Sequence, residues 1–223
     1  MVDNGQTDKG AIDVLGTVVL IHGFFRSGRN MRYLARKLEE KGYRVIVPTL
    51  PAIFGSVREC SEKLAEIING KLPENGVVHF VGHSMGGLVI RDYLSRHIVS
   101  NLGKVVMMGT PNGGSPYANL LLKLPFFRYI LKSLPDTAVP GRNTAPPINV
   151  PAPEIGIIIG KTDFFRRLLL RGDYDGLVYA ESVRRINAID ELRVPFPHES
   201  IHWRACTAEA VASFLETGKF SSI

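Results

Sequence analysis

The strongest constraint on the fold is a G-x-S-x-G motif that lies between an apolar run and a run with helical periodicity. Val77–Val81 is apolar apart from one histidine, Gly82–Gly87 follows it, and Leu88–Leu94 continues as a helix-like segment. A strand, this motif and a helix in that order are the signature of a nucleophile elbow. The outer glycines leave room where a Cβ would clash, so the turn holds Ser84 in strained backbone with its hydroxyl projecting.

The residue after this serine contributes a second chemical group. Met85 is expected at the start of the helix, where unpaired backbone N–H groups and the helix dipole favour negative charge. We therefore expect the N–H of Met85 to form half of an oxyanion hole beside the nucleophile.

Short β-branched runs alternate with longer runs of helical period along most of the chain. This alternation is typical of α/β proteins with a mostly parallel sheet and helices on both faces. A length of 223 residues with 45% hydrophobic content predicts a single domain over residues 1–223. Strands are expected at 17–21, 44–47, 77–81, 104–108, 155–159 and 192–196, and helices at 30–41, 56–68, 85–97 and 207–215.

Composition restricts the compartment and the partners. Cys60 and Cys206 are too few for a disulfide framework, so both are expected to be reduced. The polar N-terminus lacks the pattern of a secretory signal and no apolar run reaches membrane-spanning length. We therefore expect a cytoplasmic protein, although a mature form without its signal would look similar.

The net charge of +6 is concentrated in a basic stretch between residues 26 and 44. Its helix at 30–41 has an apolar inner face, and its outer face also carries Glu39 and Glu40, which favours a solvated helix face over a nucleic-acid partner. Weak attraction to anionic membrane surfaces stays open.

A serine nucleophile needs a base, and the base needs an orienting acid. Downstream of Ser84 the chain offers Asp173 and Asp175 as acids and His198 and His202 as bases. Asp175 and His198 are 23 residues apart, enough for a helix and a strand between them. His198 follows the last expected strand, at the carboxyl edge where open α/β sheets place their sites.

The regular alternation stops between Ser115 and Glu154, in an apolar-basic part followed by a proline-rich part. Long irregular segments in compact domains are typical of lids and binding loops. One interpretation is a lid that opens against lipid, with Lys123, Arg128 and Lys132 meeting headgroups. The other is a helix packed permanently over the sheet edge. In both cases the segment is expected to line an acyl pocket with Leu120, Leu124, Phe126 and Phe127.

Five elements in the right order make the chain resemble the small bacterial esterases and lipases of the α/β-hydrolase superfamily. Val18–Phe24 resembles the family's oxyanion strand and loop, Gly82–Gly87 its elbow, Gly109–Ser115 its GTP-x-x-GS stretch, Asp175–Val178 its acid loop, and His198–Ile201 with Val211–Leu215 its histidine loop and last helix.

The resemblance implies an α/β-hydrolase fold with a short cap segment and a role for each matched residue. Ser84 would be the nucleophile, His198 the general base and then acid, and Asp175 the carboxylate that orients it. Phe24 and Met85 would donate backbone N–H groups to the oxyanion. No metal or other cofactor is implied, and the substrate would be a small-molecule ester or lipid with an apolar acyl chain.

Other hypotheses remain. His202 is the rival base and Asp173 the rival acid. The same triad would serve thioester hydrolysis or acyl transfer. A protein without catalytic activity could instead use the basic helix or the apolar segment to bind a membrane or nucleic acid.

Overall fold

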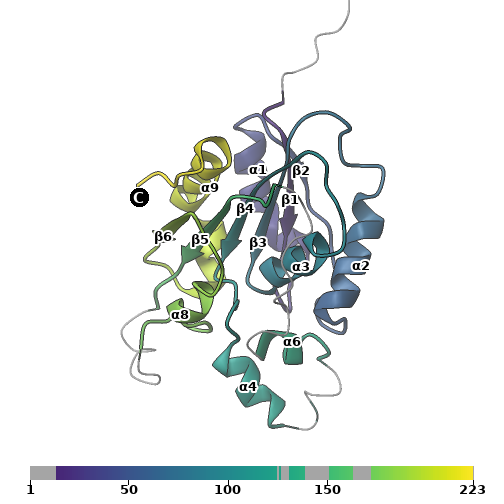
Figure 1. Cartoon of the computed structure of the whole chain (residues 1–223). Coiled ribbons are helices and arrows are strands. Elements are labelled where there is room, and N and C mark those ends of the chain that lie inside the picture. The colour runs from purple at the N-terminus through teal and green to yellow at the C-terminus, as the bar shows by residue number, and fades with distance from the viewer. Residues whose placement is uncertain (1–13, 125, 127–130, 139–150, 163–171, 223) are drawn as a thin grey trace, which may run out of the picture.

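The computed structural model describes residues 14–124, 126, 131–138, 151–162 and 172–222 (Figure 1). Its centre is a six-stranded sheet in the order β2-β1-β3-β4-β5-β6, with every neighbouring pair parallel. The predicted α/β class is confirmed. The strands are β1 (Thr17–Ile21), β2 (Arg44–Ile46), β3 (Val78–His83), β4 (Leu102–Met108), β5 (Ile155–Ile159) and β6 (Asp190–Arg193).

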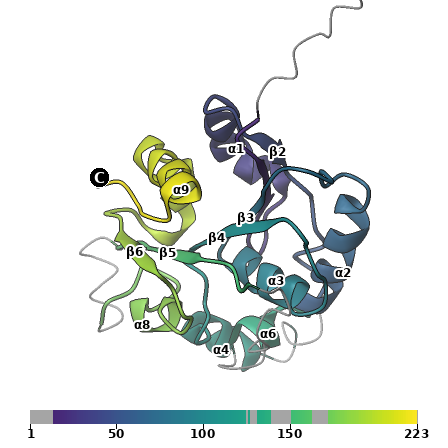
Figure 2. The same cartoon turned by 45° about the horizontal axis from the view of Figure 1, so that its top comes forward.

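Helices cover both faces of this sheet (Figure 2). On one face lie α1 (Arg32–Glu39) and α9 (Ala205–Thr217), and on the other lie α2 (Val57–Ile68), α3 (Met85–Leu94) and α8 (Ala180–Val183). The helices α4 (Pro116–Leu122) and α6 (Leu134–Ala138) lie side by side at the lower end of the molecule (Figures 1 and 2). Two short 3₁₀ helices, η1 (Gly28–Met31) and η2 (His198–Trp203), precede α1 and α9.

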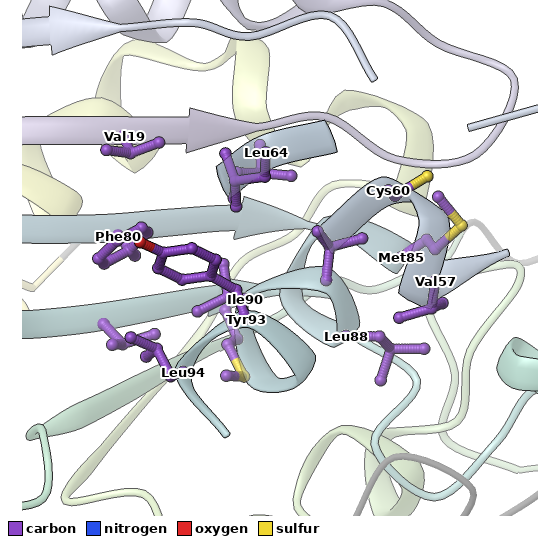
Figure 3. Close-up of a cluster of buried hydrophobic side chains, with 14 of the residues drawn as sticks. Val19, Val57, Cys60, Leu64, Phe80, Met85, Leu88, Ile90, Tyr93 and Leu94 are labelled. Carbon is purple, nitrogen blue, oxygen red and sulfur yellow. The ribbon is translucent and has the colours of Figure 1, made fainter. Parts of the chain in front are cut away.

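Alternation along the strands divides the core into two layers. Val19 and Ile21 of β1 pack toward α2 and α3, whereas Val18 and Leu20 pack toward α1 and α9, because successive strand residues point to opposite faces. Figure 3 shows part of the first layer, where Phe80 of β3 lies among residues of both helices. A strand buried on both faces is a nearly continuous apolar run, and all five residues of β1, four of them apolar, are buried.

Local signals explain where the helices start. The side chain of Ser56 accepts from the Glu59 amide at 3.1 Å and the Glu59 carboxylate accepts from the Ser56 amide at 2.7 Å, which is the predicted capping box of α2. In α4, Ser115 caps the helix and Pro116 occupies its first turn.

The start of the last helix differs from the prediction, because Thr207 is buried inside α9 and Arg204 is the N-cap. The reason is that η2 ends at Trp203, so the helix begins earlier.

The last strand is also displaced from the prediction. It was expected at 192–196, but β6 spans Asp190–Arg193. Regular pairing ends at Arg193, although the Val194 amide still donates to the Ile159 carbonyl at 2.9 Å and the Phe196 carbonyl accepts from the Lys161 amide at 2.8 Å. The histidine loop therefore begins a few residues beyond the strand rather than directly at its end.

The basic helix has the predicted solvated face. Leu34, Ala35 and Leu38 are buried, whereas Arg36 and Lys37 pair with Glu40 at 3.8 and 2.6 Å on the surface. Cys60 and Cys206 are free thiols, as predicted. In the part of the chain that the structure describes, every helix is too short or too polar to cross a membrane.

Candidate active site

The elbow holds Ser84 in a conformation that few residues adopt. Its φ of 55° and ψ of −126° lie outside the helical and extended regions, at a cost of about 1–3 kcal/mol. A Cβ at Gly82 would lie 2.6 Å from the backbone of α3, and one at Gly86 would collide with the carbonyl oxygen of Ile21. The Ser84 amide donates to the Met108 carbonyl at 2.8 Å, which ties the turn to β4.

The structure brings Ser84, His198 and Asp175 together in one hydrogen-bonded chain. The distance from His198 Nδ1 to Asp175 Oδ2 is 2.6 Å, and that from His198 Nε2 to Ser84 Oγ is 2.9 Å. Because a carboxylate only accepts, Nδ1 carries the imidazole proton and Nε2 is free to accept from the serine hydroxyl. His198 and Asp175 are buried, and Ser84 opens onto a cavity.

A tight turn fixes the carboxylate of Asp175. Its Oδ1 accepts from the amides of Leu177 at 3.0 Å and Val178 at 2.8 Å, which leaves Oδ2 for the histidine. Gly176, at φ 114°, allows the turn. The backbone carbonyl of Asp175 accepts from the His198 amide at 2.8 Å, so acid and base are joined through side chains and main chain alike.

Two glycines that we did not predict as site residues make room for this pair. A Cβ at Gly109, where φ is 58°, would lie 3.0 Å from both Asp175 Oδ2 and His198 Nδ1. A Cβ at Gly160 would lie 3.0 Å from the Asp175 Cβ. Both glycines directly follow strands, and Gly109 also begins the Gly109–Ser115 stretch that resembles a motif of the family.

The loop after β1 passes directly beside the nucleophile. A Cβ at Gly23 would lie 2.9 Å from the Ser84 Cβ. The loop is held by buried His22, whose Nε2 accepts from the Leu50 amide at 3.0 Å. Its Nδ1 therefore donates to the Gly23 carbonyl at 2.9 Å. Burial lowers the pKa of His22, so the imidazole that shapes this loop is neutral.

A cavity of about 360 Å³ opens in front of Ser84. Phe24 and Met85 both line it, as an oxyanion hole formed by their amides requires. Phe25 and Ser84 also line it, and they are the two non-glycine residues with positive φ among those described. Strained backbone is typical of functional sites. The remaining lining is mostly apolar, with Arg26 and Glu199 as its charged members, and includes Pro111, Ser115, Tyr117, Ala118, Leu121, Leu134, Thr137, Leu177 and Val178.

The structure corrects the choice of pocket residues within α4 and after it. Leu120, Leu124 and Phe126 are more than half exposed and do not line the cavity. Residues three to four apart share one side of a helix, so α4 turns a different set inward and leaves Leu120 outside. Phe127 lies outside the described residues. The inward residues of α4 are Tyr117, Ala118 and Leu121.

The cap formed by α4 and α6 is anchored to α2. Asp136 Oδ2 accepts from the Val57 amide at 3.1 Å, in the first turn of α2. Lys132 pairs with Glu59 at 3.2 Å. Arg128, expected to meet lipid headgroups with Lys132, lies outside the described residues.

The rival acid and base lie elsewhere. Asp173 is exposed and pairs with Arg193 at 2.9 and 2.5 Å. His202 is buried, with its ring tilted by 38° against that of His83 and its Nε2 bonded to Asn30 Nδ2 at 3.0 Å. Neither makes the contact with His198 or Ser84 that its role would need.

Comparison with known proteins agrees with this geometry. The sequence profile of the alpha/beta hydrolase fold matches residues 16–138, more than half of the chain. The chain belongs to this family. No curated protein matches this α/β hydrolase significantly. Among its described residues, no group of three or more His, Cys, Asp and Glu side chains could hold a metal ion.

Solved structures share the fold of this α/β hydrolase at low sequence identity. The Bacillus licheniformis lipase BlEst2 in its mature form has a TM-score of 0.71 and 17% identity, over 95% of each chain. In its propeptide form the TM-score is 0.76 at 18% identity, over 96% of the present chain but only 53% of the lipase chain. An esterase from Thermogutta terrifontis gives 0.61 at 17% identity, over 91% of this chain and 90% of the esterase.

Proposed function

We propose that this α/β hydrolase is a serine carboxylic ester hydrolase that acts on esters of apolar acyl chains through an acyl-serine intermediate. The observation that carries the proposal is the continuous hydrogen-bonded chain from Ser84 Oγ through His198 to Asp175. Each atom in that chain has the protonation that nucleophilic attack requires.

The reaction begins when Ser84 Oγ attacks the ester carbonyl and His198 Nε2 takes its proton. Asp175 stabilises the imidazolium that forms and keeps its ring oriented. The amides of Phe24 and Met85 donate to the oxyanion, and each such donor typically contributes roughly a hundred- to a thousandfold in rate. His198 then protonates the leaving alcohol, and water repeats the sequence to release the acid.

The cavity supports an apolar acyl group as the substrate. Its inner wall is formed by side chains such as Leu121 and Leu134 from the cap, next to the serine hydroxyl. Burying each methylene of an acyl chain against such a wall contributes about 0.8 kcal/mol. The cavity of about 360 Å³ gives an apolar acyl group room beside the serine hydroxyl.

The test is the hydrolysis of p-nitrophenyl esters of increasing acyl length by the purified chain. Ser84→Ala is expected to lower kcat by at least roughly 10⁴-fold with folding retained, and to prevent labelling by a fluorophosphonate. His198→Ala should lose activity similarly, whereas His202→Ala should lose no more than about tenfold. Unchanged turnover by Ser84→Ala would sink the proposal. Acyl-thioesters and added alcohols, assayed beside the oxyesters, separate ester hydrolysis from thioester hydrolysis and acyl transfer.

A further inference from the structure

Three imidazoles, those of His198, His83 and His202, lie in a row behind Ser84, with each ring tilted against the next by 45° and 38°, and we call this row the imidazole stack. The ring centroids of His198 and His83 are 5.0 Å apart, and those of His83 and His202 are 4.2 Å apart. All three side chains are at most 4% exposed. His83 is the last residue of β3, directly before Ser84, and His202 lies in η2 with His198.

The hydrogen bonds of this stack define its protonation. His83 Nε2 lies 2.9 Å from the backbone carbonyl oxygen of His198 and must carry a proton, because a carbonyl only accepts. His202 Nε2 faces two donors, Asn30 Nδ2 at 3.0 Å and the indole N–H of Trp203. It must therefore be the unprotonated nitrogen of a neutral ring. The stack thus places two neutral imidazoles behind the imidazole that becomes charged during turnover.

His83 holds the main chain of the proposed base from the elbow side. The His198 amide donates to the Asp175 carbonyl at 2.8 Å, and the His198 carbonyl accepts from His83. Both backbone groups of His198 are thereby fixed, one by the acid loop and one by the residue that precedes the nucleophile. The separation of Ser84 Oγ and His198 Nε2 depends on this second bond, since it links β3 to η2.

We propose that His83 is a positioning residue for His198, and that His202, held by Asn30 and Trp203, packs His83 in the orientation that donates to the His198 carbonyl. The proposal rests on the proposed role of His198 as the base. It concerns a side chain that is almost fully buried and bonds to the backbone of His198 rather than to the atoms that react.

The surroundings keep both supporting rings neutral. Burial lowers the pKa of His83 well below its ordinary value and that of His202 to about 3. Arg26 and the neighbouring imidazoles lower both pKa values further, and Glu199 is the carboxylate that lines the cavity beside His83. A neutral neighbour matters because a second cation in the stack would oppose the charge that His198 acquires.

The experiment compares His83→Phe with His83→Gln in ester hydrolysis. Phenylalanine keeps a flat ring in the stack but has no N–H, so kcat is expected to fall roughly 10–100-fold with KM within about twofold, as for a displaced catalytic group. Glutamine can place an amide N–H near the same carbonyl and should recover most of kcat. This rescue separates positioning from packing, since glutamine packs worse than phenylalanine in the stack.

His79→Phe is the matched control. His79 is a buried histidine of the same strand, and its Nδ1 accepts from the Lys104 amide at 2.9 Å, far along β3 from Ser84. Its loss should lower the melting temperature and leave kcat unchanged. If His83→Phe does not fold, His83→Gln is compared with His83→Asn, whose shorter amide cannot reach the carbonyl and should give the lower kcat.

The outcomes separate this proposal from the proposed function. If the wild-type chain hydrolyses esters and Ser84→Ala does not, a wild-type kcat for His83→Phe refutes the positioning role alone. Equal losses in the phenylalanine and glutamine variants, or in glutamine and asparagine, also refute it. A wild-type chain without esterase activity refutes the proposed function instead.

Discussion

Replacing Asp175 with asparagine tests whether this carboxylate keeps the imidazole proton of His198 on Nδ1. The change is isosteric, but asparagine offers one accepting oxygen where aspartate offers two. Asp175 uses both oxygens, Oδ1 on the amides of Leu177 and Val178 and Oδ2 on His198. The asparagine must therefore choose between the turn and the histidine.

The turn determines that choice. Facing the NH₂ group toward the turn would leave two buried amides unpaired, at about 1–3 kcal/mol each. The NH₂ group therefore faces His198 and donates to Nδ1, and the imidazole proton moves to Nε2, where it can no longer accept from Ser84. To restore the tautomer with the proton on Nδ1, the asparagine amide must flip and leave the two turn amides unpaired, which costs about 2–6 kcal/mol in total. A loss of roughly 10⁴ in kcat, equivalent to about 5.4 kcal/mol, lies within that range.

The assay is kcat for a short-chain nitrophenyl ester near neutral pH, with the melting temperature as a check on folding. Asp173→Asn is the matched control, because Asp173 lies two residues away and pairs with Arg193 on the surface. It should keep kcat within about twofold, as exposed ion pairs contribute at most about 1 kcal/mol and this one is remote from Ser84. An Asp175→Asn variant within tenfold of wild type would refute the tautomer argument, and so would a larger loss in Asp173→Asn.

Two further predictions concern the cavity and the pH dependence of stability. Leu121→Trp should shift the preferred esters toward shorter acyl chains because Leu121 lines the cavity. Leu120 is 60% exposed, so Leu120→Trp should leave the chain-length profile unchanged. Equal shifts in both variants would contradict the assignment of Leu121 to the cavity wall. Burial lowers the pKa of His79 from 6.5 to about 4, so between these values the unfolded chain binds more protons than the folded chain. The contribution of neutral His79 to the free energy of unfolding is complete above about pH 6.5. It is lost as the pH falls toward 4, by up to about 1.4 kcal/mol per pH unit. Urea unfolding measured at several pH values should give His79→Phe a free energy of unfolding that changes less between pH 4 and 6.5 than that of the wild type. An unchanged pH dependence would contradict the assignment.

The sequence predicted the sheet well because its signals are local. A strand buried on both faces, such as β1, is a nearly continuous run of β-branched and other apolar residues, and Thr17–Ile21 was predicted with its observed bounds. The end of β3 and the start of β4 differ from the prediction by two residues each, and β6, near the end of the chain, differs at both of its ends. The observed β6 ends before Pro195, and α9 begins before Thr207. There the boundaries depend on where the histidine loop packs, which propensity does not record.

The cap shows the same limit within one helix. The segment after Ser115 was predicted to line an acyl pocket, and α4 does line the cavity in front of Ser84, but with Leu121 rather than its neighbour Leu120. Nearly every residue from Leu120 to Leu124 is apolar, so periodicity alone cannot say which side faces inward. The anchoring of Asp136 to the first turn of α2 places the other half of this cap, and it joins residues 79 positions apart.

The features that the sequence did not predict concern the acid and base rather than the nucleophile. The elbow is a local structure, because Gly82, Ser84 and Gly86 create its strain and its exposure within five residues. Asp175 and His198 come from distant loops, next to the space left by Gly109, and we propose that the hydrogen bond from His83 aligns His198. A motif can therefore specify a reactive serine, whereas the distance from that serine to its base is a property of the packed sheet edge. Variants of His83, rather than variants of the elbow, therefore test the proposed alignment of His198 with Ser84.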